Sequence, residues 1–448
     1  MQLTNAIATP AFLQRIQWVN NPIGYMENAV QNYPDIFISK ILTGKPVIFV
    51  NQPQAIQEIL TNDRKKYTAP GGKYNNILRP IVGNYSVFSL DGETHRKRRQ
   101  LVMPSFHGDR MKAYGDLIIK LAKQVMDDIP INQPFLARSA MQEISTQVIL
   151  QSVFGLYEGE RCQQLKYLMR KLLDIFSSPF ASSFLFFPFL QKDLGKFSPW
   201  GKFLRDREQI DKLIYAEIAE RRQNTNSEGI DVLSLLMLAK DEDGESLTDE
   251  ELRDELMTLL LAGYETTATA MAWGLYWSHY LPETGKKVQQ EFDSLNNYPD
   301  AMDIFKLPYL TAFCNEILRI NPVAMVTFPR LMQEKVELLG YEIPPETVVF
   351  GCIYLVHQRE DLYPQPRQFK PERFLERQFS PYEFMPFGGG VRRCVGEALA
   401  MFEMKLVLGT ILSKYQLALV DSQPEIPRRR GVTLAPGKGV KMVLTGIR

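Results

Sequence analysis

The feature that most limits how this chain can fold is one long apolar helix with a clear beginning and end. Thr248 and Glu251 have the spacing of a capping box, which predicts the start of a helix, and Pro282 predicts its end. At 1.5 Å per residue such a helix is about 50 Å long. It is therefore long enough to cross a whole domain.

The apolar part of this helix, Leu256–Leu281, also has the length of a membrane span. Its only strongly polar side chains are Glu265 and His279, and Glu265 would lie near mid-bilayer, where a carboxylate is costly. The flanks lack the aromatic and basic anchors of a membrane helix. A buried core helix is therefore favoured, with a single-span membrane protein as the alternative that fractionation would test.

The rest of the chain is predicted to be mainly α-helical with a minor β-sheet region. Helical spacing of apolar residues covers 109–128, 137–156, 200–223 and 397–415. Strand patterns occur at 46–50, 336–341 and 348–355, and the tail 432–444 resembles a small hairpin. No strand–helix alternation predicts a doubly wound sheet. We expect one domain over residues 1–448, with a helix-rich core and small β regions near 34–60, 336–355 and the C-terminal tail.

Charge and cysteine content exclude several classes of function. The 52 basic and 51 acidic side chains give a net charge of +1, so a nucleic-acid partner is not expected. The four cysteines and the four scattered histidines do not have metal-site spacing. The N-terminus does not resemble a secretory signal, so we expect free thiols and a cytoplasmic location.

The densest chemical signal is the glycine-rich segment 387–396, Phe-Gly-Gly-Gly-Val-Arg-Arg-Cys-Val-Gly, which we call the cysteine loop. A dinucleotide loop needs glycine where Arg393 stands, and a phosphate loop needs Gly-Lys-Ser/Thr. The segment instead suits a thiolate ligand, because glycines allow N–H groups to turn towards the sulfur of Cys394. The dipole of the following helix favours the anion. Arg392 is placed to pair with a carboxylate of a bound cofactor.

The middle of the long helix contains residues that helices disfavour. Gly263 and the pair Thr266-Thr267 are poor helix formers. A threonine hydroxyl can bond to the carbonyl one turn back and bend the helix, and a local opening there would make room for a small ligand. Glu265 beside them is either a functional acid or a buried acid satisfied by its neighbours.

Two further groups of charged residues stand out. Glu316 and Arg319 lie at i, i+3 and can form an ion pair on one helix face. The run from His95 to Arg99 forms a basic helical face, which fits either a solvated surface or a functional role.

Taken together, these residues resemble the cytochrome P450 family. The five fixed positions of that family's haem-binding signature are filled by Phe387, Gly390, Arg392, Cys394 and Gly396. The other motifs follow in the family's order, and the resemblance covers nearly the whole chain. It implies the cytochrome P450 fold, with haem b as cofactor.

The resemblance also implies a role for each motif residue. Cys394 is the axial ligand of the haem iron, with Phe387 in the same loop, and Glu265 and Thr266 form the pair that delivers protons during oxygen activation. The arginines expected to bind the haem propionates are Arg99, Arg330 and Arg392. His95 stands where the family usually has tryptophan. Arg373, in the segment Pro-Glu-Arg-Phe, completes a buried structural triad with Glu316 and Arg319.

The implied activity is that of a haem-thiolate monooxygenase, which inserts one oxygen atom from O₂ into a lipophilic substrate. The phenylalanines between Phe176 and Phe203 lie where the family has its substrate lid. They favour a fatty acid, terpenoid or retinoid, unless they are ordinary core residues. An exposed part of this region would permit peripheral membrane contact.

Electrons are expected from a separate ferredoxin-like protein. Its docking site is predicted to be a basic patch made of Arg96, Lys97, Arg98, Arg393 and Lys405. Two alternatives stay open. One is a peroxide-driven or isomerising relative, and the other is a haem-based sensor without turnover.

Overall fold

The computed structural model describes most of the chain, and the structural statements below concern the described residues. These are residues 3–42, 45–63, 65–71, 77–106, 108, 110–174, 179–187, 190–195, 198–223, 231–295 and 299–448. The structure is mainly helical with small sheets, so the predicted fold class is confirmed.

The helices and strands are distributed along the whole chain. The helices are α1 (Ala11–Asn20), α2 (Pro22–Asn32), α3 (Pro53–Thr61), α4 (Arg79–Val82), α5 (Gly92–Val102), η1 (Met103–Phe106), α6 (Arg110–Asp127), α7 (Ala137–Phe154), α8 (Glu160–Asp174), α9 (Pro179–Phe186), α10 (Pro199–Gln223), α11 (Val232–Leu238), α12 (Asp249–Tyr280), α13 (Pro282–Asp293), α14 (Ala301–Phe305), α15 (Pro308–Ile320), α16 (Ile353–His357), α17 (Arg373–Glu376), η3 (Gly390–Arg392) and α18 (Glu397–Lys414). The strands are β1 (Ile36–Ser39), β2 (Val47–Val50), β3 (Tyr67–Thr68), β4 (Pro134–Leu136), β5 (Arg330–Met332), β6 (Val336–Leu338), β7 (Tyr341–Ile343), β8 (Val348–Gly351), β9 (Tyr415–Leu419), β10 (Pro427–Arg430), β11 (Thr433–Pro436) and β12 (Lys441–Ile447).

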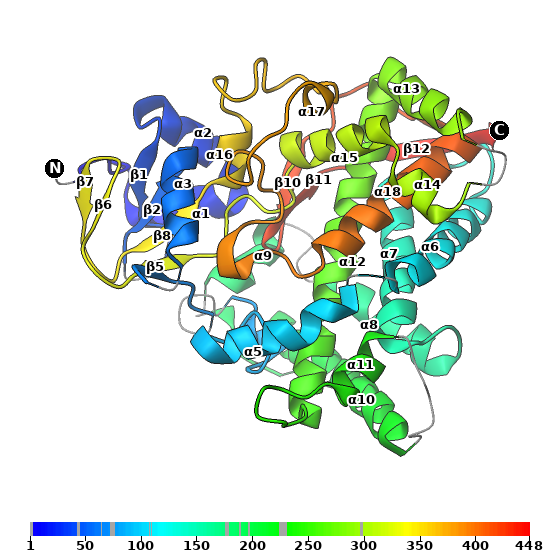
Figure 1. Cartoon of the computed structure of the whole chain (residues 1–448), viewed down its shortest axis with the longest axis horizontal. Coiled ribbons are helices and arrows are strands. Elements are labelled where there is room, and N and C mark those ends of the chain that lie inside the picture. The colour runs from blue at the N-terminus through cyan, green and yellow to red at the C-terminus, as the bar shows by residue number, and fades with distance from the viewer. Residues whose placement is uncertain are drawn as a thin grey trace.

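Helix α12 runs through the centre of the molecule (Figure 1). The N–H of Glu251 donates to Oγ1 of Thr248 at 3.2 Å, and the N–H of Thr248 donates to Oε2 of Glu251 at 2.9 Å. The predicted capping box is therefore confirmed, and Pro282 begins the next helix as expected. The 32 residues of α12 span about 48 Å. Because α12 packs against α7, α10, α13, α15 and α18, it organises the helical core.

The main sheet lies at one side of the molecule, together with α2, α3 and α16 (Figure 1). Its strand order is β1-β2-β8-β5-β3, with β2 and β8 parallel and the other pairs antiparallel. Strand β5 begins at Arg330. One of the predicted site residues, Arg330, therefore lies on an inner strand of the sheet.

Several predicted strands differ from those in the structure. Residues 336–341 form two short strands that reverse at Leu339 and Gly340, where φ is +52° and +77°. β8 pairs with its neighbours only as far as Gly351, so the predicted strand over 348–355 is wrong beyond that point, where α16 follows. The predicted tail hairpin is also wrong, because β11 pairs backwards with β10, and β12 pairs with β4 and β9.

Within the part of the chain that the structure describes, no helix is both long and apolar enough to span a bilayer.

Candidate active site

The cysteine loop is a tight turn that requires glycine at two positions. Gly388 and Gly390 have φ values of +69° and +64°, in the left-handed region. A Cβ on Gly390 would lie 1.9 Å from Oδ2 of Asp63, so no larger residue fits there. The N–H of Cys394 donates to the carbonyl of Phe387 at 3.0 Å, which closes the loop just before α18.

Cys394 differs from the other cysteines because its side chain is exposed. Cys162, Cys314 and Cys352 are all buried. The surrounding protein raises the pKa of the Cys394 thiol by withdrawing it from bulk water, and the N–H of Gly396 acts in the opposite direction. A thiol that is enclosed by protein and still accessible borders open space within the fold, which suits a ligand better than a core residue.

The middle of α12 also borders open space. Residues Leu252–Leu256 and Thr267–Tyr276 are buried, whereas Leu261–Gly263, Glu265 and Thr266 are partly exposed. Partial exposure between two buried stretches indicates a hollow beside the helix. Since α12 packs against α18, which follows Cys394 directly, the hollow and the thiol lie on neighbouring elements.

Thr266 makes the hydrogen bond predicted for a threonine within a helix. Its hydroxyl donates to the carbonyl of Ala262 at 2.6 Å. The helix continues without a break through this segment, so the predicted local opening is wrong. The space beside α12 therefore comes from small and partly exposed side chains and not from an opened turn.

Glu265 lies beside Thr266 and is held by three polar side chains. Its Oε1 accepts from Nη1 of Arg138 at 3.2 Å and lies 3.3 Å from Nε of Arg430, and its other oxygen accepts from Gln142. The Glu265 side chain is 14% exposed. It is thus a satisfied acid at the edge of the hollow, between α7, α12 and β10.

Arg392 occupies the inner side of the cysteine loop. It donates to the carbonyls of Ala69 and Val87, each at 2.7 Å, and to that of Leu90. Its guanidinium lies 4.6 Å from the ring of Phe328, and burial lowers the pKa of Arg392 to about 10. The nearest carboxylate oxygen, on Asp91, is 3.6 Å away. This guanidinium is therefore fixed mainly by neutral carbonyls.

Arg99 brings a second guanidinium to the same loop from α5. Its Nη1 donates to the carbonyl of Arg393 at 2.6 Å, and burial lowers the pKa of Arg99. His95, one turn earlier, is buried on the same helix. The structure therefore brings Arg99 and Arg392 together at the cysteine loop.

Arg330 also reaches the cysteine loop, but its donors are already engaged. It forms a buried ion pair with Asp63 and donates to the carbonyls of Phe328 at 2.7 Å and Gly389 at 2.9 Å. Asp63 in turn accepts from the N–H of Val391 at 2.8 Å. Arg330 and Asp63 thus shape the loop, and the role of Arg330 as a propionate ligand stays a prediction.

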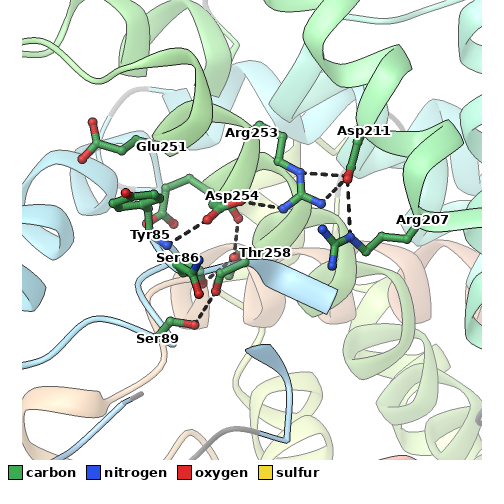
Figure 2. A network of polar contacts seen from close by, with 12 residues as sticks. Tyr85, Ser86, Ser89, Arg207, Asp211, Glu251, Arg253, Asp254 and Thr258 are labelled. Carbon is green, nitrogen blue, oxygen red and sulfur yellow. Dashed lines mark hydrogen bonds and ion pairs between the residues drawn. The ribbon is translucent and has the colours of Figure 1, made fainter. Parts of the chain in front are cut away.

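A polar network ties α10 to α12 (Figure 2). Nε of Arg253 donates to Oδ1 of Asp211 at 2.8 Å, and its Nη1 donates to Oδ1 of Asp254 at 2.6 Å. Arg207 donates to Asp211 as well, and Asp254 accepts from the N–H of Tyr85 at 2.8 Å. The network therefore extends from α10 through α12 to the segment 83–90.

The network holds the segment 83–90, and the same segment contacts Arg392. A Cβ on Gly83, where φ is +89°, would lie 2.1 Å from Asp254. The hydroxyl of Thr258 donates to Oγ of Ser86 at 2.6 Å, as Figure 2 shows. Since the carbonyls of Val87 and Leu90 accept from Arg392, the acids of α12 position the cysteine loop indirectly.

Arg98 and Glu255 are structural residues that the sequence did not single out in this role. Arg98 is buried, donates to Glu251, lies 3.2 Å from Glu255 and donates to the carbonyl of Tyr85 at 2.7 Å. Glu255 also accepts from the N–H of Val87 at 2.8 Å, and burial raises the pKa of Glu255 to about 7. The spacing of Glu251 and Glu255, which places both on one face of α12, is the feature of the sequence that could have indicated this structural role.

Glu316, Arg319 and Arg373 meet in the core, as the resemblance implied. Oε1 and Oε2 of Glu316 accept from Arg319 at 2.8 and 2.7 Å, and Oε1 also accepts from Nε of Arg373 at 3.2 Å. Glu316 and Arg319 are fully buried. The three residues join α15 to α17.

The predicted basic patch is wrong for two of its five members. Arg98 and Lys405 are buried, and Nζ of Lys405 donates to the carbonyl of Phe305 at 2.9 Å. Arg96 lies 3.0 Å from Glu242, and Lys97 pairs with Asp243. A basic run in sequence therefore does not become a basic surface here, because acids from the turn before α12 neutralise it.

The aromatic-rich region is only partly described. Phe176 lies outside the described residues, whereas Phe184 and Phe186 on α9 are partly buried and Trp200 and Phe203 on α10 are buried. Helix α9 contacts α1 and β10, and the ring of its Phe186 lies over Arg429 of β10.

Comparison with known proteins identifies the family. A profile described as Cytochrome P450 matches residues 8–442. This chain belongs to the cytochrome P450 family. Its relatives include the putative cytochrome P450 135B1 of Mycobacterium tuberculosis, 33% identical over 431 residues, which are 96% of this chain and 89% of that protein. The putative cytochrome P450 137 of the same organism is 31% identical over 430 residues, or 93% of this chain and 84% of the other.

Solved P450 structures share the fold. The retinoic acid bound cyanobacterial CYP120A1 superposes with a TM-score of 0.86 at 23% identity, covering 97% of this chain and 96% of the other. The cytochrome P450DA heme domain gives a TM-score of 0.83 at 21% identity, covering 97% and 95%. The predicted cytochrome P450 fold is therefore confirmed.

Cytochromes P450 are monooxygenases that carry a haem with a thiolate ligand, and the residues of this P450 fit that group. Cys394 offers a thiol that borders open space, and Phe387 flanks it in the same loop. Arg99 and Arg392 are guanidiniums that have no hydrogen-bonded carboxylate among the described residues. The two propionates of a bound haem would supply that missing negative charge.

Proposed function

We propose that this P450 inserts one atom of O₂ into a lipophilic substrate such as a fatty acid, terpenoid or retinoid. The observation that carries the proposal is the exposed thiol of Cys394 on the loop that leads into α18, a helix that packs against α12, whose middle is partly exposed. Bound haem supplies the oxygen-activating chemistry, and its thiolate ligand favours O–O cleavage. The protein supplies position, charge and protons.

In this proposal Cys394 holds the iron, and Arg99 and Arg392 hold the propionates. The carbonyls of Val87 and Leu90 fix the direction of Arg392, so α12 controls the cofactor site through the segment 83–90. Arg392 already lies against Phe328, which restricts its guanidinium plane. The arginine is thus preorganised for a carboxylate and loses little entropy on binding it.

Thr266 and Glu265 are proposed as the proton-delivery pair. The hydroxyl of Thr266 donates to Ala262, so its lone pairs remain available to accept a hydrogen bond in the hollow. Glu265 stands between this hollow and the partly exposed Arg138 and Arg430. In this proposal Glu265 takes up protons at its exposed edge and passes them towards Thr266.

The lipophilic character of the substrate is supported by partly exposed apolar side chains on α12, at the hollow, and on α9, which packs against β10. Leu261 and Ala262 on α12 and Phe184 and Phe186 on α9 are partly exposed apolar side chains. The fold neighbour CYP120A1 binds retinoic acid, a lipophilic molecule. A separate ferredoxin-like electron donor, a cytoplasmic location and peripheral membrane contact belong to this proposal as well, and they follow from the resemblance to the family.

The decisive experiment compares wild type with Cys394→Ser. Wild type is expected to show the reduced carbon-monoxide absorption band for which the family is named, and to consume O₂ in step with product when reductant and substrate are present. Cys394→Ser is expected to lose that band. A colourless protein after expression with added haem contradicts the proposal. Turnover with peroxide but not with O₂ and reductant, or tight haem binding without turnover, favours the two alternatives instead.

A further inference from the structure

Arg429 on β10 is a buried guanidinium that has no acidic partner among the described residues. Its side chain is 1% exposed. Nη2 donates to the carbonyl of Trp18 at 2.9 Å and Nη1 to that of Gly431 at 3.3 Å, while Nε has no hydrogen-bond partner. An unpaired buried charge is costly, because the desolvation of the ion is not offset by an opposite charge. Such a group indicates a missing anionic partner.

The surroundings of Arg429 are otherwise apolar. Its guanidinium carbon lies 5.0 Å from the ring of Trp18 on α1 and 4.9 Å from that of Phe186 on α9. Sδ of Met325, in the segment after α15, lies 4.0 Å from Nη2. Two aromatic rings therefore fix the guanidinium within a lipophilic wall, where an anion would meet a directed charge in a medium of low polarity.

Two chain segments lead from Arg429 towards the hollow beside α12. The next residue, Arg430, is paired with Glu265, which directly precedes Thr266. Met325 begins the segment that ends at Arg330, whose Nη2 binds the carbonyl of Gly389 in the cysteine loop. These two segments therefore connect the surroundings of Arg429 with Glu265 on α12 and with the cysteine loop.

We propose that Arg429 binds the carboxylate of a long-chain lipophilic acid, whose apolar part extends towards α12. This inference rests on the proposed monooxygenase function and narrows its substrate class from lipophilic molecules to lipophilic carboxylic acids. A guanidinium can hold a carboxylate by two parallel hydrogen bonds, and a neutral terpene offers no such group.

Helix α9 covers the proposed carboxylate site. Phe186 stacks on Arg429, and Oγ of Ser182 accepts from the N–H of Gly431 at 2.8 Å. Entry of the carboxylate requires α9 to separate from β10. The region that the resemblance marks as a lid thus lies directly on the charge that would recognise the substrate.

The test uses haem-loaded protein and pairs of ligands that differ only in their polar end. Lauric to stearic acids are titrated beside the alcohols of the same lengths. Binding is followed by the haem Soret band and, independently, by quenching of tryptophan fluorescence, because Trp18 contacts Arg429. Wild type is expected to bind at least one acid at least about tenfold more tightly than its alcohol.

The variant Arg429→Met is expected to raise the Kd of the acid about 30-fold or more and that of the alcohol less than about threefold. Arg428→Met is the matched control, since it removes the same charge from the neighbouring exposed position and should leave acid binding unchanged. Arg429→Lys keeps the charge and should retain part of the preference. If Arg429→Met does not fold, the inference is tested by Arg429→Lys and by the preference of wild type for acids over alcohols.

Equal binding of acids and alcohols by wild type overturns the inference, as does an equal loss of both in Arg429→Met. The proposed function fails differently. Its failure appears as the absence of a thiolate-ligated haem spectrum, whereas the tryptophan signal still reports whether acids bind.

Discussion

Replacing Glu316 by Gln should destabilise the protein far more than replacing a surface acid. The carboxylate of Glu316 accepts three hydrogen bonds from the guanidiniums of Arg319 and Arg373, at 2.7, 2.8 and 3.2 Å. It also accepts from the N–H of Lys370 at 2.8 Å. In Glu316→Gln two buried cations lose their counter-charge, which typically costs about 3 to 5 kcal/mol.

The corresponding change in melting temperature can be worked out from the chain length. At about 2.1 cal/mol/K per residue, the 448 residues give an unfolding entropy of about 0.9 kcal/mol/K, so the melting temperature should fall by about 3 to 5 °C. The measurement is thermal unfolding of the holoprotein by circular dichroism at a fixed scan rate. Unfolding of a chain this long is treated as one transition only if the haem and ellipticity signals coincide.

Two further variants separate the buried charge effect from a general loss of packing. Arg373→Met leaves Glu316 paired with Arg319, so it should cost less than Glu316→Gln. Glu372→Gln breaks a partly exposed contact with Lys287 and should cost about 0 to 1 kcal/mol. The reasoning is refuted if Glu316→Gln melts within about 1 °C of wild type, or no lower than Glu372→Gln.

Three other predictions concern the site and its pH dependence. Thr266→Ala should leave haem bound but divert reducing equivalents to peroxide, measured as the ratio of peroxide to product; a fully coupled variant contradicts its role in proton delivery. Burial raises the pKa of Glu403 from 4.5 to about 7, with only the Ser145 hydroxyl opposing it, so the native state holds this proton more tightly than the unfolded state. Stability should therefore fall as pH rises from about 4.5 to about 7, by up to about 3 kcal/mol from this group, and melting curves of Glu403→Gln should lose that part of the slope. Asp63→Asn should loosen the cysteine loop, because Arg330 loses its counter-charge and only one side-chain oxygen is left to accept from Arg330 and the N–H of Val391. Faster haem transfer to an apoprotein acceptor would show it, and an unchanged rate contradicts that role.

The long helix and the cysteine loop were predictable because each is specified by residues close together in sequence. The capping box of α12 needs only Thr248 and Glu251, and the loop needs glycines at Gly388 and Gly390. Local geometry of this kind leaves a local signal. Pairing between distant strands leaves no local signal. The prediction for the tail was therefore wrong, because β12 pairs with β4, some 300 residues earlier in the chain.

The burial and the partners of the charged residues were predictable only in part. Glu316 and Arg319 lie one turn apart, so their ion pair is visible in the sequence. Arg98 and Arg330 could not be placed, because their acidic partners, Glu255 and Asp63, are 157 and 267 residues away. A run of basic residues shows that a helix is charged, but it does not show which of its faces other elements will cover.

Four arginines that are buried or partly buried differ in what surrounds them. Arg221 and Arg253 are bonded to aspartates, and the pKa of each is raised, the expected result of a nearby carboxylate. Burial lowers the pKa of Arg392 to about 10 and that of Arg429 to about 9. Arg392 lies at the cysteine loop, where a haem propionate can supply the missing charge.

A haem propionate does not explain the unpaired charge of Arg429. It lies among Trp18, Phe186 and Met325, and not at the cysteine loop. A haem can supply a carboxylate to Arg392, whereas a carboxylate for Arg429 would have to come from a second acidic molecule. A pKa of Arg429 that rises when a fatty acid binds, seen by NMR of its guanidinium, would show that Arg429 takes part in binding the acid. If acid binding leaves the Arg429 signal unchanged, its burial is structural and the substrate is recognised by shape alone.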